Sequence, residues 1–162
     1  MESAKDLFLH ELKDIYYAEN KLAKELKDMA SEVSNDQLAS AIEEHRGVTE
    51  KQAQRLEQVF ELIGERPEGE KCDGIEGLLQ EFKSFVKDES PEPKVLDVFA
   101  TGAGIKVELY EMAAYGSLIR LADQLGLSEA AELFQMTLNE EEDTARELEQ
   151  MNEKLSQEIP TR

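Results

Sequence analysis

The sequence predicts an all-α fold built from long helices that pack side by side in an antiparallel bundle. Apolar side chains recur at alternating spacings of four and three residues through most of the chain. That spacing is typical of a helix that buries one face in a core. No segment alternates polar and apolar residues as a half-buried strand would. Glycine, proline, serine and asparagine gather at a few places between the helical stretches, where we expect the chain to turn.

The first two helices are expected over residues 3–33 and 35–64, as an antiparallel hairpin. The apolar stripe of the first helix is interrupted at mid-length by Glu19. The stripe of the second is polar in its middle third, where His45 lies. Asn35, between the two helices, is a good helix-capping residue, so the second helix should turn back along the first.

A long connection over residues 65–92 separates this hairpin from the rest of the chain. Proline and glycine lie near both of its ends, and apolar residues at helical spacing predict a short helix over 74–88. The connection is long enough to run back along a helix of roughly 30 residues, about 45 Å at 1.5 Å per residue. One long crossover in a four-helix bundle is a ferritin-like connectivity.

The remaining two helices are expected over residues 93–125 and 128–159, with Gly126 at the turn between them. Each again carries an acid on its apolar stripe, Glu111 in the first of them and Glu141 in the second. Both acids lie 15 residues from Gly126, so they should meet at one level of the bundle. The stripe around Glu111 is expected to include Ala114 and Leu121, and Glu108 shares its face one turn earlier.

The overall charge and composition narrow the possible partners. Acidic residues outnumber basic ones by 37 to 18, which gives a net charge of −19. Such a surface repels nucleic-acid phosphates and anionic membranes, so neither is expected as a partner. At 162 residues the chain is expected to form a single domain. One cysteine excludes an internal disulfide and a cysteine metal cluster, and the lack of a signal peptide or long apolar stretch favours the cytoplasm.

The acids on the core stripes form the main functional hypothesis. A carboxylate moved from water into a core costs several kcal/mol unless a cation, a proton or hydrogen bonds compensate it. Carboxylates together with imidazole suit iron or manganese, and ferritin-like di-metal sites take ligands from all four helices. The candidate metal ligands are Glu19, His45, Glu108, Glu111 and Glu141.

Two features of the sequence speak against a complete di-metal site. It contains no Glu-x-x-His pair, which such sites use on two of their helices. Counted from the turn at Asn35, His45 should also lie roughly 8 Å along the bundle from Glu19, at 1.5 Å per residue. A metal-free layer of hydrogen-bonded polar groups therefore stays open as an alternative. Tyr17, Tyr110 and Tyr115 are candidates to hydrogen-bond the acids.

Five segments of the sequence carry a family resemblance. They are LFLHELKD at residues 7–14, YAE at 17–19, QVFE at 58–61, VELYE at 107–111 with AYG at 114–116, and LADQLG at 121–126. Together they resemble the YciE/YciF family of ferritin-like stress proteins over nearly the whole chain. The resemblance implies a homodimer of ferritin-like bundles that acts in stress response. It also implies a di-iron centre with ferroxidase or other oxidoreductase activity.

The candidate ligands sit at positions where the resemblance implies metal-site residues, but other positions depart from the family pattern. The family usually has acids at the positions of Gly47 and Val48, and an aspartate at the position of Ala145. These departures imply a weakened, single-metal or empty site. The alternative function is that of a metal-free, acidic, dimeric structural or interaction protein.

Overall fold

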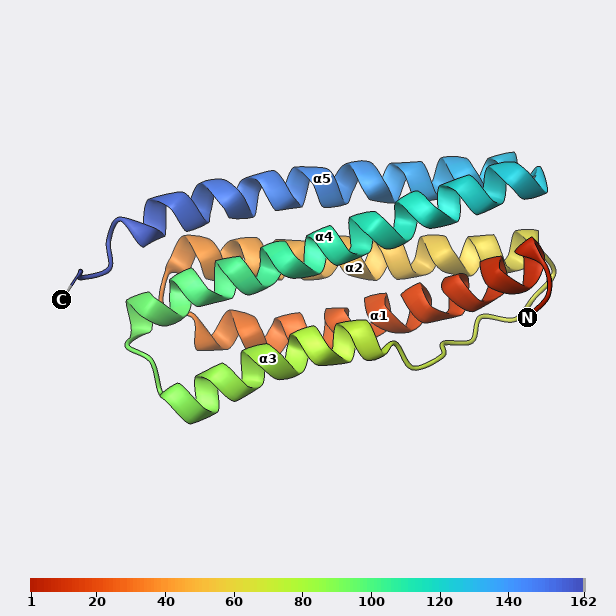
Figure 1. Ribbon diagram of the computed structural model, residues 1–162. Coiled ribbons are helices and arrows are strands. Elements are labelled where there is room, and N and C mark those ends of the chain that lie inside the picture. The colour runs from red at the N-terminus through yellow and green to blue at the C-terminus, as the bar shows by residue number, and fades with distance from the viewer. Residues whose placement is uncertain (162) are drawn as a thin grey trace.

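The computed structural model of the protein describes residues 1–161, which form five helices and no strand (Figure 1). The helices are α1 (Ala4–Glu32), α2 (Asp36–Leu62), α3 (Asp73–Glu89), α4 (Pro93–Leu125) and α5 (Ser128–Ser156). The predicted all-α fold is confirmed, with four long helices in a bundle and a fifth on the crossover. The last helix ends at Ser156, a few residues before the expected position 159.

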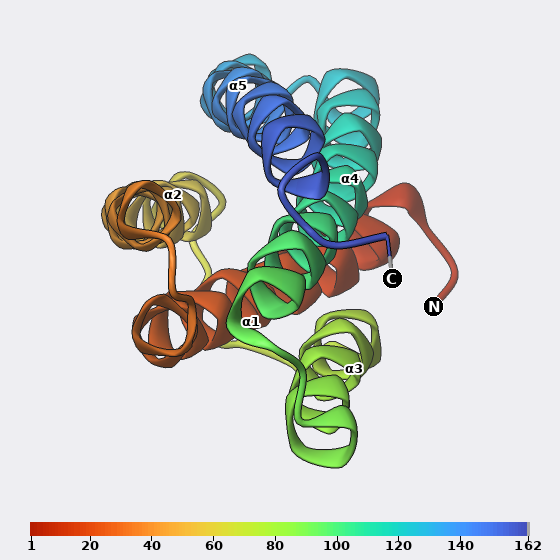
Figure 2. The same cartoon turned by 90° about the vertical axis from the view of Figure 1, so that its left-hand side faces the viewer.

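The bundle consists of two helical hairpins. The helices pack most extensively within the hairpins α1–α2 and α4–α5, and α1 against α4 provides the main contact between the two. The contact between α2 and α5 is smaller, and the end-on view shows these two helices along one side of the bundle (Figure 2). Among the described residues, 1–161, no helix is both long and apolar enough to cross a membrane.

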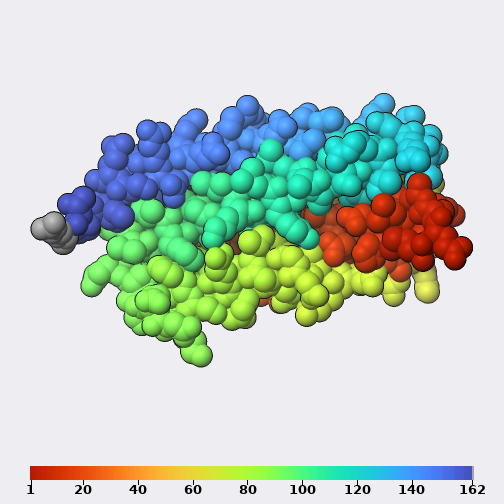
Figure 3. Space-filling model, in the orientation of Figure 1, coloured from red at the N-terminus to blue at the C-terminus, as the bar shows by residue number. Residues whose placement is uncertain are grey.

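The crossover returns the chain along α1, first as an extended loop and then as α3. The backbone amide of Glu70 donates a hydrogen bond to the carbonyl oxygen of Lys13 at 3.1 Å, which fastens the loop to α1. The thiol of buried Cys72 caps α3 by accepting a hydrogen bond from the amide of Ile75. Helix α3 then packs against α4 and α1 and covers the groove between them (Figure 3).

One buried aspartate ties the two hairpins together at the end where α4 begins. The Asp97 carboxylate is 2% exposed and accepts hydrogen bonds from the amide and the hydroxyl of Ser34, both at 2.7 Å. Ser34 lies in the turn between α1 and α2. The turn of the first hairpin and the start of the second therefore share one level of the bundle.

The core is apolar toward both ends of the bundle and polar at mid-length. Aromatic and aliphatic side chains such as Phe8, Phe134, Leu26 and Leu38 fill the two ends. Between them lies a set of buried polar side chains that we call the polar layer: Glu19, Thr49, Gln52, Glu108, Glu111, Thr137 and Glu141.

Candidate metal centre

Four glutamates are buried in the core because they share their helix faces with apolar residues that pack there. Glu19 on α1 lies between buried Ile15 and Leu22, so that face of the helix cannot pack without burying the acid as well. Glu108 and Glu111 on α4 and Glu141 on α5 are placed in the same way, and none of the four is more than 1% exposed. The acids that the sequence placed on the core stripes are thus inside the core.

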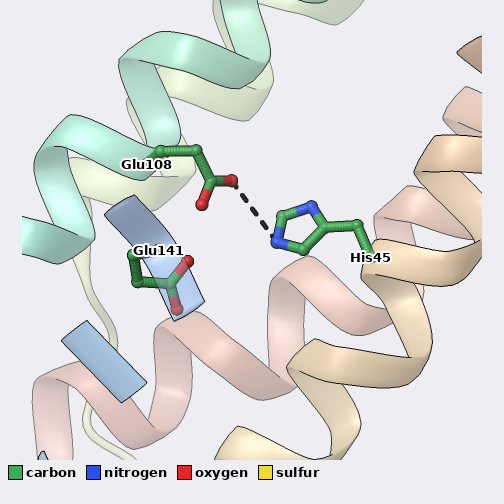
Figure 4. A group of neighbouring side chains, drawn as sticks. All are labelled: His45, Glu108 and Glu141. Atoms are coloured by element: carbon green, nitrogen blue, oxygen red, sulfur yellow. Dashed lines mark ion pairs between the residues drawn. The ribbon is translucent and has the colours of Figure 1, made fainter. Parts of the chain in front are cut away.

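His45, Glu108 and Glu141 form the tightest group of possible ligands. Each offers one ligand atom, and these atoms all lie within 4.8 Å of one another. The Nε2 atom of His45 is 3.4 Å from Oε1 of Glu108. Figure 4 shows the imidazole pointing from α2 toward the two carboxylates, which come from α4 and α5. Three helices therefore converge on a space of the size that one metal ion needs.

The level of His45 explains why Glu108, and not Glu111, is its neighbour. The contact between Ser34 and Asp97 aligns the α1–α2 turn with the start of α4. Glu108 lies one turn nearer to that end than Glu111 does, and His45 is also displaced toward that end. The expected displacement of His45 is thus matched by a second acid on α4. Glu19 and Glu111 are not part of the group of three.

Glu19 has a different partner, because the hydroxyl of Tyr115 donates a hydrogen bond to its Oε1 atom. Tyr115 is fully buried, although the expected stripe of α4 ran through Ala114 instead. Of the three candidate tyrosines, Tyr115 alone is hydrogen-bonded to an acid of the polar layer within residues 1–161. Tyr17 donates to Glu76 at the surface of α3, and the Tyr110 hydroxyl lies 3.0 Å from the Cys72 thiol.

Most candidate ligand atoms of His45 and of the acids in the polar layer lack a hydrogen-bond partner among residues 1–161. Both carboxylate oxygens of Glu111 and of Glu141 are buried and unpartnered, as are one oxygen each of Glu19 and Glu108 and the Nε2 atom of His45. Buried polar atoms are almost always hydrogen-bonded in native proteins, so a cluster of exceptions calls for an explanation. A bound cation would satisfy these atoms together.

The electrostatics of the layer also favour a positive charge. Burial raises the pKa of Glu111 well above its usual range, and the charges of Glu19, Glu141 and Glu108 raise it further. The pKa values of Glu19 and Glu108 are raised for the same reasons. Burial lowers the pKa of His45 to about 4, so near neutral pH its imidazole is uncharged and can act as a ligand. A cation would compensate the acids without needing a proton.

The nearest basic side chain is already engaged outside the group. The Arg55 guanidinium donates two hydrogen bonds to Glu140, at 2.8 and 2.9 Å, and one to the Thr137 hydroxyl at 2.6 Å. Gln52 donates to the same Glu140 carboxylate at 3.1 Å. Within residues 1–161, no lysine or arginine forms an ion pair with any of the four acids. The involvement of Arg55 and Glu140 was not predicted, because both lie beside the core stripes of their helices.

The three positions that depart from the family pattern supply no ligand. A Cβ atom added at Gly47 would have nothing within 4 Å, Val48 lines a cleft beside His45, and Ala145 is a small buried residue of α5. The residues present still fit a metal ion, since they combine one neutral imidazole with several buried carboxylates. That donor set suits iron or manganese.

Comparison with known proteins places the chain in a family. A family model described as "Domain of unknown function (DUF892)" matches residues 3–159. Protein YciF of Escherichia coli K12 is 37% identical over 145 residues, which are 89% of this chain and 87% of YciF. The crystal structure of the E. coli stress protein YciF is similar with a TM-score of 0.93 and 34% identity, covering 98% of this chain and 100% of that one.

Two further solved structures share the fold. YcfI from Rhodopseudomonas palustris has a TM-score of 0.88 and 36% identity, over 91% of this chain and 94% of that one. A protein from Xanthomonas campestris has a TM-score of 0.74 at 20% identity, over 95% of this chain and 94% of that one, which shows the fold alone. The expected resemblance is confirmed: this chain belongs to the DUF892 family and is a relative of the stress protein YciF.

Proposed function

We propose that this protein is a stress-associated carboxylate metalloprotein of the di-iron type. The observation that carries the proposal is the set of buried, unpartnered carboxylate oxygens that face the uncharged imidazole of His45. The association with stress rests on the similarity to YciF, which is described as a stress protein.

His45 and the four glutamates of the polar layer divide into two groups in this proposal. His45, Glu108 and Glu141 hold one metal ion, because their ligand atoms already lie together. Glu111 and Glu19 would hold a second ion, and the hydrogen bond from Tyr115 orients the Glu19 carboxylate. Two iron ions bound there would supply electrons for the reduction of dioxygen or peroxide. The apolar side chains around the layer exclude bulk water and strengthen the electrostatic interactions inside it.

Metal analysis of protein purified without chelators tests this proposal. We expect iron or manganese at up to two ions per chain, and a rise in melting temperature when either metal is added to the metal-free protein. Glu141→Gln should lose most of the bound metal and most of that rise. Glu142→Gln is the matched control, because Glu142 is the next residue of α5 and is exposed.

Two results would contradict the proposal. One is iron and manganese far below one ion per chain, with no change in melting temperature when they are added. The other is equal loss of metal in Glu141→Gln and Glu142→Gln, which would place the bound ions on the acidic surface. Zinc should be measured in parallel, since a carboxylate-histidine set can also bind it.

Specific observations favour a second candidate function, that of a metal-free structural or interaction protein. Gly47, Val48 and Ala145 replace acids at positions where the family resemblance implies them. In addition, the description of YcfI proposes a structural role for that protein. In this case the buried acids would be protonated and hydrogen-bonded, and the melting temperature would not respond to metal.

We also propose that the chain forms a homodimer, as the family resemblance implies. Leu109 on α4 and Met136 on α5 are each 52% exposed and offer apolar contact area on the second hairpin. Light scattering at several protein concentrations would measure the mass. A monomer at all concentrations would refute this part of the proposal.

A further inference from the structure

A cleft opens between α2 and α5 and leads to the metal centre. Its volume is about 280 Å³, slightly below the roughly 300–1,000 Å³ of pockets for drug-sized ligands. The two helices form its mouth, and parts of α1 and α4 form its floor. The cleft lies where contact between the hairpins is smallest, since α2 and α5 pack on each other less than α1 does on α4.

Small residues keep this cleft open. Ala41 and Val48 line it on α2, where longer side chains would reach across toward α5. Gly104 also lines the cleft, but there α4 and α5 are in close contact, since a Cβ atom at Gly104 would come within 2.9 Å of the Leu148 side chain.

At its inner end the cleft reaches His45. This side chain is 10% exposed, and its Nε2 atom has no hydrogen-bond partner in residues 1–161. His45 also lines a second chamber of about 30 Å³, comparable with the volume of one water molecule, which Glu108 borders. Leu26, Met29 and Gly104 line both spaces. The imidazole therefore stands between a cleft that accepts an organic molecule and a chamber that accepts only a very small one.

The chemistry of the cleft selects a class of ligand. Apolar side chains dominate its walls: Leu26, Met29, Ile42, Val48, Leu148 and Met151. Its charged lining residues are Glu44, Glu140, Asp143, Glu147 and Lys51. Glu140 is paired with Arg55 and Asp143 with Arg146, which leaves Glu44 and Glu147 as the lining acids without an ion pair within residues 1–161. Apolar walls favour an alkyl chain. The two unpaired acids, Glu44 and Glu147, are exposed and make the mouth acidic, which disfavours carboxylates, sulfates and phosphates and favours a neutral or cationic group.

We propose that the cleft binds a small aliphatic molecule with an uncharged or cationic head group, and that one end of this molecule contacts the imidazole of His45. If the bound molecule is a substrate, the proposal rests on the proposed metal function. Binding of the molecule alone does not depend on that function, because the walls and the acidic mouth of the cleft are present without metal. The acids at the mouth should weaken the binding of fatty acids.

The experiment uses three probes of equal chain length, octylamine, 1-octanol and octanoate, with the metal-free full-length protein. Calorimetry measures their affinities, and NMR of the His45 ring reports on the inner end of the cleft. We expect octylamine and octanol to bind and to shift the His45 resonances. Octanoate should bind about tenfold more weakly or worse.

A matched pair of variants locates the binding. Val48→Phe fills the cleft and should weaken octanol binding about tenfold or more. Ser40→Phe places the same aromatic side chain at an exposed residue of α2 outside the cleft and should leave the affinity unchanged. If Val48→Phe does not fold, as judged by circular dichroism, Ala41→Phe blocks the cleft from another position.

Several outcomes would overturn the inference. These are the absence of binding by octylamine and octanol, unchanged His45 resonances at saturation, or equal affinity in Val48→Phe and the wild type. Binding of octanoate as tight as that of octanol would overturn the role given to the acidic mouth. Probe binding by a protein that takes up no metal would refute the proposed metal function and still support the cleft as a binding site.

Discussion

Glu111 is the acid of the core whose charge is least compensated, and its side chain is fully buried. Both of its oxygens lack a partner among residues 1–161, and burial together with three neighbouring acids raises its pKa. Such a group destabilises a metal-free protein whenever it is ionised. It is therefore the residue whose neutral replacement should most clearly separate the metal-bound from the metal-free protein.

We predict that Glu111→Gln stabilises the metal-free protein by about 1–3 kcal/mol near pH 8, the size expected when a buried unpaired charge is removed. The same change should reduce the stabilisation by iron or manganese, since a ligand is lost. Urea unfolding of both proteins, with and without metal, measures the two effects. Glu142→Gln serves as the exposed control, and a Glu111→Gln protein less stable than wild type without metal would contradict the prediction.

The raised pKa values also predict a dependence on pH. Because the buried acids hold protons that the unfolded chain releases, their contribution to stability is present at low pH and is lost as pH rises through the folded pKa. The lowered pKa of His45 acts in the opposite direction, but only below its ordinary value of 6.5. Between pH 6.5 and about 8 the buried acids therefore determine whether the free energy of unfolding rises or falls with pH.

We therefore expect the melting temperature of the metal-free protein to fall between pH 6.5 and about 8. The gain in melting temperature on adding metal should grow over the same interval, because metal ligands must lose their protons. Calorimetry with and without metal measures both trends. A metal-free melting temperature that is flat or rising over this interval would mean that the buried acids are compensated in another way.

The residues of the site could be predicted from the sequence only in part. A charged residue on an apolar stripe is a strong signal, and it marked Glu19, Glu111 and Glu141, all of which are buried. Tyr115 lay off the expected stripe, which passed from Glu111 to Leu118 through Ala114, a step of three and then four. A step of four and then three joins the same two buried residues through Tyr115, so the spacing rule alone could not choose between them.

At the scale of the elements, the ends of a helix were predicted correctly where the sequence has a clear helix-starting or helix-ending residue. Helix α4 runs from Pro93 to Leu125 as expected, because proline suits the first turn of a helix and Gly126 ends it with a φ of 72°. The end of α5 lacks such a signal before Pro160, and the helix stops at Ser156. The extended part of the crossover could not be placed from sequence, since its hold on α1 depends on tertiary contacts such as Glu70 to Lys13.

The contact between Asp97 and Ser34 joins the two hairpins and can be tested by a single substitution. We predict that Asp97→Ala destabilises the protein by about 2–4 kcal/mol, because it removes the acceptor for two hydrogen bonds and leaves a small cavity. Urea unfolding measures the change. Asp28→Ala, at an exposed position of α1, should change stability by less than about 0.5 kcal/mol.

An effect of Asp97→Ala no larger than that of Asp28→Ala would show that the two hairpins stay aligned without this contact. The metal affinity of the Asp97→Ala protein adds a second measurement. If the contact sets the level of His45 against Glu108, affinity should fall together with stability.

For the molecule as a whole, the net charge of −19 is the dominant feature. Like charges on a compact surface repel one another, and salt screens this repulsion. We predict that raising the salt concentration from about 0.05 to about 1 M stabilises the metal-free protein by roughly 1–2 kcal/mol, or about 3–6 °C in melting temperature. Scanning calorimetry in NaCl and in KCl measures it.

Screening depends on ionic strength, so the two salts should act alike. A much larger effect of one of them would point to specific binding of that cation. A melting temperature that falls as salt is added would show that favourable ion pairs, such as those of Lys21 and Lys83 with Glu25, outweigh the repulsion.

The long crossover divides the candidate ligands between the two halves of the chain. Cleavage in the exposed loop after α2 would leave one fragment that carries Glu19 and His45 and another that carries Glu108, Glu111 and Glu141. Neither fragment alone owns a full set of ligands. If the polar layer binds metal, the two fragments of a split protein would associate when metal is present and dissociate when a chelator removes the metal.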